Sequence, residues 1–212
     1  MRKVKGNLFV VSAPSGAGKT TLCRLLSEKM PGIRHSVSYT TRKKRPGEVA
    51  DRDYTFLSEA EFMRMQRAGK FAEWAKVHGN LYGTSKKRLG EMLGKGIDVI
   101  LDIDVQGARK LRLLYNDAVY IFVLPPSLPA LRERLHGRMS DSETEIEKRL
   151  DRAVKEIKEY KKYDYVIVNR VFDEALRELC SIVTARRLGE DRIEPSWVKE
   201  NLLLRREVGR WI

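Results

Sequence analysis

Cysteine, histidine and long apolar runs are scarce in this sequence of 212 residues, and each shortage excludes a class of protein. The two cysteines, Cys23 and Cys180, lie far apart without C-x-x-C spacing, which excludes a disulfide scaffold and favours reduced thiols. The three histidines are scattered, so neither a histidine metal site nor a Ser-His-Asp triad has support. No apolar run approaches the roughly 18 residues needed to cross a bilayer, so we expect a cytoplasmic protein without a membrane partner.

The N-terminal stretch GNLFVVSAPSGAGKTT, residues 6–21, has two interpretations. Basic residues precede it, as they precede the apolar part of a secretion signal. Its apolar run covers only residues 8–11, however, whereas a secretion signal needs roughly 7–15 apolar residues. We therefore interpret it as a strand that leads into a glycine loop.

Positive charge is in excess, with 42 Lys and Arg against 29 Asp and Glu, a net charge of +13. This excess is typical of proteins with a polyanionic partner. Much of it lies in mixed runs such as EIEKRLDRAVKEIKEY, which predict a solvated helix with i,i+4 ion pairs. We therefore predict that the anionic partner is a nucleotide and not a nucleic acid.

Short apolar runs bounded by turn residues alternate with helical patterns along the chain. The helical patterns cover residues 20–30 and 143–160, the second beginning with a capping-box pattern at Ser142. Alternating strands and helices predict an α/β fold with a parallel sheet. The runs that we expect to be fully buried strands are residues 8–11, 99–103, 119–124 and 165–168.

Two segments interrupt this alternation. Residues 35–87 are rich in Thr, Arg, Tyr and Gly and contain two strand-like pieces, so we expect an inserted substrate lobe. Residues 127–150 form a charged helical excursion, which we interpret as a mobile lid. The remaining residues, 1–34, 88–126 and 151–212, are then the core of a single domain.

The loop after the first strand has the order of a P-loop, because a buried strand, a glycine loop and a helix follow one another. Gly16 and Gly18 let the backbone N–H groups turn towards phosphate oxygens at the positive end of the helix. Lys19 can reach the β and γ phosphates of ATP, and Thr20 can place its hydroxyl on Mg²⁺. Ala13 replaces the first glycine of the general pattern, but the context supports phosphate binding. The predicted ATP-binding residues here are Ala13, Pro14, Ser15, Gly16, Ala17, Gly18, Lys19, Thr20 and Thr21.

Two carboxylates stand at the end of the second buried run, in the stretch VILDIDVQG. Because side chains alternate along a strand, Asp102 and Asp104 are expected to project to the same side. A carboxylate at the end of a buried strand beside a P-loop can hold Mg²⁺ directly or through water, and we predict this role for Asp102. The alternative is that both carboxylates cap the next helix.

Five blocks of sequence together resemble the guanylate kinase family, in the order that the family has them. The resemblance extends from residue 8 to about residue 170, and it implies a parallel-sheet P-loop NTPase core with an inserted GMP-binding lobe and a helical lid. It also implies Mg²⁺-dependent transfer of the γ-phosphoryl group of ATP to GMP or dGMP. The sequence leaves open whether the protein is a monomer or a homodimer. The blocks are APSGAGKT, SVSYTTRKKRPGEVADRDY, FAEWAKVHGNLYGT, VILDIDVQG and RLHGR.

The resemblance also implies roles for individual residues. Glu73 matches the family's guanine reader, whose carboxylate accepts the N1–H and 2-amino donors; Ser38 and Thr84 match donors to O6, and Asp104 adds an acceptor near the purine. The acceptor phosphate is expected to contact cationic and phenolic donors. The residues at the family's phosphate-binding positions are Arg42, Arg45, Tyr54 and Tyr82.

The lid positions of the family are matched by arginines that close over the triphosphate. These are Arg134, Arg138 and Arg149, and Met139 stands where many members have glycine. Asn169, after the last predicted strand, is expected to contact the adenine. Phosphoryl transfer depends mainly on positioning and on stabilising negative charge. We therefore predict that Lys19, Arg45, Arg138 and Arg149 are the catalytic residues.

Two other interpretations are open at this point. A guanylate-kinase-like interaction module would bind protein ligands in the nucleotide lobe, but such modules typically have a degraded phosphate loop. A kinase of the same fold that acts on a ribose bisphosphate would have no use for a guanine reader such as Glu73. Competition between GMP and AMP would separate the second alternative from a guanylate kinase.

Overall fold

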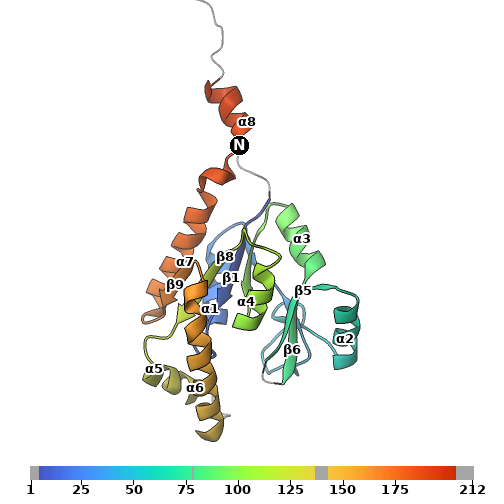
Figure 1. The fold of residues 1–212 in the computed structure, drawn as a ribbon, viewed down its shortest axis with the longest axis vertical. Helices are drawn as coiled ribbons and strands as arrows, with labels where there is room; N and C mark the ends of the chain where they lie inside the picture. The colour runs from blue at the N-terminus through green and yellow to red at the C-terminus, as the bar shows by residue number, and fades with distance from the viewer. Residues whose placement is uncertain (1–4, 78, 137–142, 204–212) are drawn as a thin grey trace, which may run out of the picture.

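The computed structural model describes residues 5–77, 79–136 and 143–203. Its central element is a five-stranded sheet with the order β2-β7-β1-β8-β9 (Figure 1). All four strand pairs in this sheet are parallel, which confirms the predicted α/β fold. The strands are β1 (Leu8–Ser12), β2 (Ile33–His35), β7 (Asp98–Asp102), β8 (Val119–Leu124) and β9 (Tyr165–Val168).

Helices cover both faces of this sheet. On one face α1 (Lys19–Lys29) and α7 (Phe172–Arg187) bury alternate residues of β1, including Phe9 and Val11. On the other face α3 (Lys86–Gly94) and α4 (Val105–Arg112) cover the intervening residues of β1, including Val10. All five residues of β1 are buried as a result. Each large apolar side chain buried in this way stabilises the fold by roughly 1.5–3 kcal/mol.

The sheet differs from the predicted one at both of its edges. The edge strand β2 was not predicted, because its three residues include only one buried apolar side chain. In β9, which was expected to be fully buried, only Ile167 is buried, while Tyr165, Val166 and Val168 are exposed. The prediction was wrong because β9 is an edge strand, which has a neighbouring strand on one side only and is therefore less covered than the inner strands.

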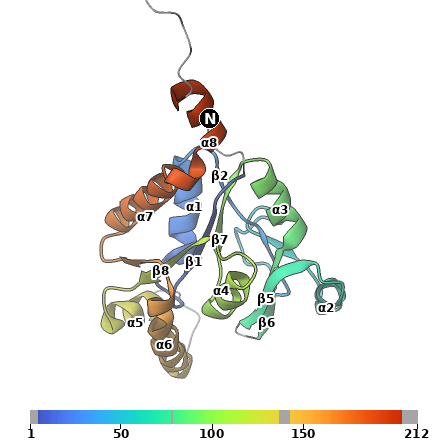
Figure 2. The same cartoon turned by 45° about the horizontal axis from the view of Figure 1, so that its top comes forward.

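A second sheet of four strands lies beside the first and has the order β4-β3-β6-β5 (Figure 2). One helix, α2 (Glu59–Arg67), packs on it through Phe62, which contacts Phe71 and Leu81. The sequence predicted only two strand-like pieces here, because two of the four strands have just three residues. The strands are β3 (Ser38–Thr40), β4 (Tyr54–Phe56), β5 (Phe71–Val77) and β6 (Asn80–Ser85).

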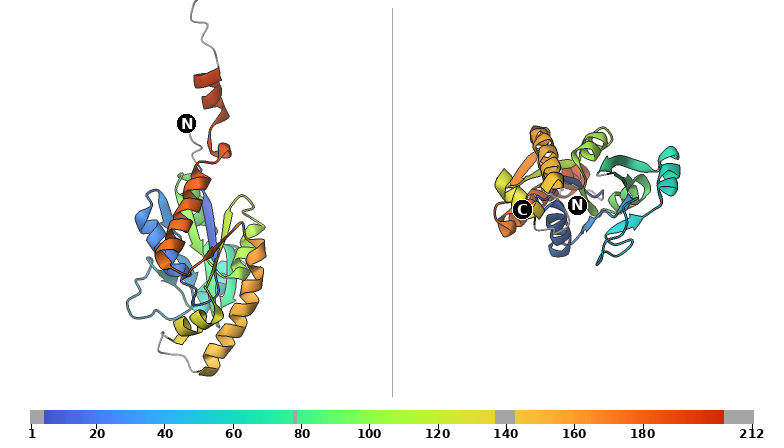
Figure 3. Two further views of the ribbon diagram at one scale, coloured as in Figure 1. Left: turned by 90° about the vertical axis from the view of Figure 1, so that its left-hand side faces the viewer. Right: turned by 90° about the horizontal axis from the view of Figure 1, so that it is seen from below.

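Two helices between β8 and β9 pack against each other (Figure 3). They share an apolar cluster of their own. They are α5 (Leu128–His136) and α6 (Glu143–Ile157), and Leu131, Leu135 and Ile146 are buried between them. The helix predicted over 143–160 ends earlier, because its last turn becomes the 3-10 helix η1 (Lys158–Lys162). The predicted cap Ser142 lies outside the described residues.

The chain continues beyond α7 as three short helices that extend away from the sheet (Figure 1). They are η2 (Glu190–Arg192), α8 (Pro195–Val198) and the π-helix η3 (Lys199–Leu203). Among the described residues, no helix has the length and the apolar composition that spanning a bilayer requires.

Candidate functional site

The predicted phosphate loop joins β1 to α1, as the sequence pattern indicates. Gly16 and Gly18 both have a φ of 92°, a conformation that side chains of L-residues rarely adopt. A methyl group added at Gly18 would also lie only 2.6 Å from Nδ2 of Asn169. The loop turns through a hydrogen bond from the N–H of Ala17 to the carbonyl of Pro14, at 3.1 Å. This backbone brings the N-terminus of α1 to the carboxyl ends of the parallel strands, where a phosphate can bind.

Lys19 and Thr20 both reach the end of β7, which is the neighbour of β1 in the sheet. Nζ of Lys19 donates to the carbonyl of Ile103 at 3.0 Å, and Oγ1 of Thr20 donates to Oδ2 of Asp102 at 2.7 Å. Nε2 of His35, on β2, lies 2.9 Å from Oδ1 of the same carboxylate. Burial alone would raise the pKa of Asp102, but the hydrogen bond and charge of His35, with Lys19 and Thr20, hold it well below its usual range. Asp102 is therefore ionised at neutral pH.

The hydroxyl of Thr20 and the carboxylate of Asp102 form an oxygen donor set that suits Mg²⁺. This ion is usually held by one or two protein oxygens, with substrate phosphates and water as its other ligands. No group of three or more His, Cys, Asp or Glu side chains with the geometry of a metal site occurs in the part of the chain that the structure describes. The donor set thus fits an ion that a nucleotide brings with it, and not a closed structural metal site.

Asp104 is not on strand β7; of the two carboxylates, it is the one that caps the next helix, as the alternative interpretation expected. β7 ends at Asp102, and Asp104 is the N-cap of α4, where its Oδ1 accepts a hydrogen bond from the N–H of Gly107 at 2.8 Å. The expectation that both carboxylates project from one side of a strand was wrong, because the chain turns into a helix between them. Asp104 nevertheless lies near Glu73, since a methyl group on Gly107 would be 2.6 Å from Oε2 of Glu73 and 3.2 Å from Oδ1 of Asp104.

The residues predicted to recognise guanine lie together on the second sheet and at the start of α4. Glu73 on β5 is 5% exposed, and its Oε1 accepts a hydrogen bond from Oγ1 of Thr84 on β6 at 2.6 Å. Ser38 is buried on β3, the other neighbour of β6. Burial raises the pKa of Glu73 to about 7; Asp104 adds to the rise, and the hydrogen bond from Thr84 opposes it. The site therefore holds a carboxylate that changes charge near neutral pH.

A cleft of about 1440 Å³ is lined by the residues that were predicted to bind the acceptor phosphate. Thr20 and Arg149 also line this cleft. The guanidinium carbon of Arg42 lies 5.3 Å from the centroid of the Tyr54 ring, and that ring lies 6.1 Å from the ring of Tyr82. Arg45 also lines the cleft. The cleft thus joins the end of the phosphate loop to the second sheet.

Two of the residues predicted to belong to a lid contact the phosphate loop and its surroundings. Nη2 of Arg149, on α6, donates to Oγ of Ser15 at 2.7 Å, and Nη2 of Arg134 donates to the carbonyl of Asn169 at 3.0 Å. Asn169 is only 2% exposed, and its Nδ2 donates to the carbonyl of Ala17 at 2.8 Å. This side chain faces the phosphate loop, and its predicted contact with adenine stays a prediction.

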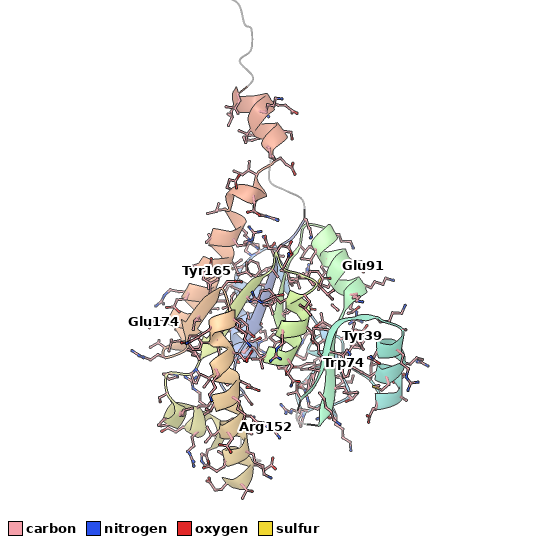
Figure 4. All side chains as sticks on the ribbon, viewed as in Figure 1. Tyr39, Trp74, Glu91, Arg152, Tyr165 and Glu174 are labelled. Carbon is pink, nitrogen blue, oxygen red and sulfur yellow. The ribbon has the colours of Figure 1, made fainter. Side chains whose placement is uncertain are left out.

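Figure 4 labels one residue in each of two units beside the central sheet. Arg152 lies on α6, and Trp74 lies on β5 of the second sheet. Arg138, predicted to be catalytic, and Met139 lie outside the described residues.

Three residues of the site were missed by the sequence interpretation. They are His35, which contacts Asp102, Glu48, which contacts Arg42, and Glu156, which accepts a hydrogen bond from the N–H of Ser15. Glu156 follows Arg149 by two helical turns, so the helix period could have placed both on one face of α6. No periodicity marks Glu48 or His35, because one lies in a loop and the other on a strand of three residues.

Comparison with known proteins identifies the family. The model of the guanylate kinase family matches residues 5–186 of the chain. The guanylate kinase of Geobacter metallireducens is 55% identical over 191 residues, which cover 90% of this chain and 94% of that protein. The guanylate kinase of Alcanivorax borkumensis is 48% identical over 204 residues, which cover 95% of this chain and 99% of that protein.

A solved structure agrees with these relatives. The crystal structure of guanylate kinase from Anaplasma phagocytophilum matches this fold with a TM-score of 0.81 at 34% identity, covering 96% of this chain and 98% of that chain. The matched region of the family model includes the phosphate loop, both sheets and the helices α5 and α6. The chain therefore belongs to the guanylate kinase family.

Proposed function

We propose that this protein transfers the γ-phosphoryl group of ATP to GMP or dGMP, giving ADP and GDP or dGDP. The observation that carries the proposal is the shared cleft. Thr20 at the end of the phosphate loop, Arg149 from α6 and the phosphate-binding set on the second sheet all line it. Two phosphate sites that open into one cleft allow a donor and an acceptor phosphate to meet in line.

The donor is bound by the backbone of the phosphate loop and by Lys19. The N–H groups of the loop and the N-terminus of α1 stabilise the phosphate oxygens, and Lys19 exchanges the carbonyl of Ile103 for the β and γ phosphates. Thr20 and Asp102 would hold Mg²⁺ directly or through water. When bound there, Mg²⁺ would neutralise negative charge on the phosphate groups of the donor.

The acceptor is bound by the second sheet, which we propose as the GMP-binding lobe. An ionised Glu73 accepts hydrogen bonds from N1–H and the 2-amino group of guanine, with O6 near Ser38 and Thr84. Adenine, which lacks the 2-amino group and has no hydrogen on N1, loses these bonds. Arg42, Arg45, Tyr54 and Tyr82 then orient the acceptor phosphate towards the donor.

The α5–α6 unit is proposed as the lid. Arg149 already reaches the phosphate loop through Ser15, so a small movement of α6 brings its guanidinium onto the transferring phosphoryl group. Arg134 and Arg138 complete the set. Each of these charges stabilises the transition state more than the ground state, because negative charge spreads over the equatorial oxygens during transfer.

The test is a coupled assay of ADP release with Mg-ATP, in which GMP, dGMP, AMP, CMP, UMP and a ribose bisphosphate are offered at equal concentration. Turnover with the two guanine nucleotides alone is expected. Turnover with a ribose bisphosphate would contradict the role of the guanine-binding set. Binding of ATP without turnover on any acceptor would favour an interaction module, although the intact phosphate loop argues against that function.

A further inference from the structure

A carboxylate occupies the proposed acceptor-phosphate site. Oε1 of Glu48 lies 2.6 Å from Nη2 of Arg42, and its Oε2 accepts from Nη1 of Arg42 at 3.1 Å, so the pair is bidentate. The same Oε2 accepts the backbone N–H of Arg45 at 2.7 Å. Both side chains of the pair are mostly buried, with 12% of Arg42 and 19% of Glu48 exposed. Glu48 therefore binds the guanidinium of Arg42 and the backbone N–H of Arg45, the two arginine residues assigned to the acceptor phosphate.

The donors of Arg42 are nearly all used by these contacts. A guanidinium has five N–H groups, and Glu48 takes one from each terminal nitrogen. The second hydrogen of Nη1 goes to the carbonyl of Lys43 at 2.7 Å, and the side chain also bonds to Tyr82. A phosphate that binds Arg42 through both terminal nitrogens must therefore displace the carboxylate of Glu48.

We propose that Glu48 is an internal competitor of the acceptor phosphate, which holds Arg42 and the N–H of Arg45 until a guanine nucleotide displaces it. This inference rests on the proposed function, in which Arg42 binds the phosphate of GMP. It makes Glu48 a specificity-determining residue. A free anion gains only the contacts that Glu48 already makes, whereas GMP gains additional binding at Glu73 and its neighbours.

Arg42 does not need Glu48 to stay in the cleft. Its guanidinium is also held by the carbonyl of Lys43, by the bond to Tyr82, and by the rings of Tyr54 and Phe56, whose centroids lie 5.3 Å and 5.9 Å from it. A carboxylate and a phosphate that share one guanidinium, by contrast, repel each other over a few ångströms. Removing the charge of Glu48 should therefore strengthen anion binding.

The ionisation of Glu48 agrees with this role. Burial alone would raise its pKa, but the hydrogen bonds from Arg42 and from the backbone of Arg45, together with their charges, hold the pKa below its ordinary value. The carboxylate therefore carries its full charge at neutral pH and competes as an anion.

The test compares Glu48→Gln with the control Asp51→Asn by calorimetric titration with inorganic phosphate. A saturating non-hydrolysable Mg-ATP analogue occupies the phosphate loop in each titration. Asp51 lines the same cleft, and its positive φ of 59° suits asparagine, so the control removes one negative charge without touching Arg42. We expect Glu48→Gln to bind phosphate on the order of tenfold tighter than wild type and Asp51→Asn to change the affinity by less than about twofold.

Unchanged or weaker phosphate binding by a folded Glu48→Gln variant would overturn the proposal, because Glu48 would then be a support for Arg42. A structure of the wild-type protein with GMP is a second test that needs no variant. The carboxylate of Glu48 must have left both terminal nitrogens of Arg42 in that complex, and a carboxylate that still bonds to either nitrogen overturns the proposal. Failure of the proposed function would be observed separately, because the wild-type protein would then not bind GMP. The comparison of the phosphate titrations would still test whether Glu48 competes with an anion.

Discussion

Replacing Glu73 by glutamine is expected to stabilise the free protein and to weaken its binding of GMP. Both effects come from one buried carboxylate. Glu73 is 5% exposed, and burial raises its pKa from an ordinary value of 4.5 to about 7. Burial therefore destabilises the ionised form of Glu73, which is the form that guanine recognition requires. Such a conflict between stability and function is common.

The stability effect follows from this pKa. A carboxyl group whose pKa is raised by folding contributes stability below about pH 4.5 and loses that contribution as the pH rises through about 7. The difference corresponds to about 3 kcal/mol at 1.36 kcal/mol per pH unit, as an upper limit. Glutamine has nearly the same shape and no charge, so at pH 8 the thermal midpoint of Glu73→Gln should rise by roughly 5–10 °C. At pH 4, below both the ordinary and the raised pKa, the increase should nearly vanish.

The binding effect has the opposite sign. Hydrogen bonds to a charged group contribute about 1.5–3 kcal/mol each, and glutamine would place an N–H donor against a guanine donor. The dissociation constant of GMP should therefore increase on the order of 10- to 100-fold at pH 8, measured by calorimetry. In wild type, GMP affinity should also fall as the pH drops through about 7, and this step should be absent in Glu73→Gln.

The two measurements refute different parts of the reasoning. An unchanged or lower thermal midpoint of Glu73→Gln at pH 8 would mean that the carboxylate is not destabilised by burial. Unchanged GMP affinity would remove Glu73 from the acceptor site. Phosphate titration of GMP itself occurs near the same pH, so only a pH step that disappears in Glu73→Gln belongs to this residue.

Three further substitutions test other parts of the molecule. Lys19→Ala should lower the turnover of GMP on the order of 10²- to 10³-fold in a steady-state assay, and wild-type turnover would exclude the proposed mechanism. Gly107→Ala places a methyl group 2.6 Å from Oε2 of Glu73 and displaces that carboxylate, so the KM for GMP should rise at least about tenfold while the KM for ATP stays constant. Asp98→Ala removes the partner of Arg187 Nε (2.7 Å) and should destabilise the fold by about 2–3 kcal/mol in urea denaturation, with kcat unchanged. A lower kcat would mean that Asp98 also affects the site.

Much of the core was predictable because its signals are local. The strand β1, the phosphate loop and α1 are contiguous, and each element has its own pattern of apolar residues, glycines and polar residues. Predictions failed where neighbours in space decide the outcome. β9 has the composition of a buried strand, yet most of it is exposed because it lies at the sheet edge. Asp104 caps α4 because the chain turns there, which strand alternation does not indicate.

The sequence by itself determined the glycine loop, the alternation of strands and helices, and the family resemblance, because these depend on residue types at short spacing. Only the tertiary structure decided which distant side chains meet. Asp102 contacts His35 and Thr20, which lie 67 and 82 positions away in the chain, because β7 lies between β2 and β1. The bond between Glu48 and Arg42 spans six positions, but a loop without periodicity forms it. Such contacts depend on strand order and loop conformation, which are set by the burial of the whole chain and not by any local pattern.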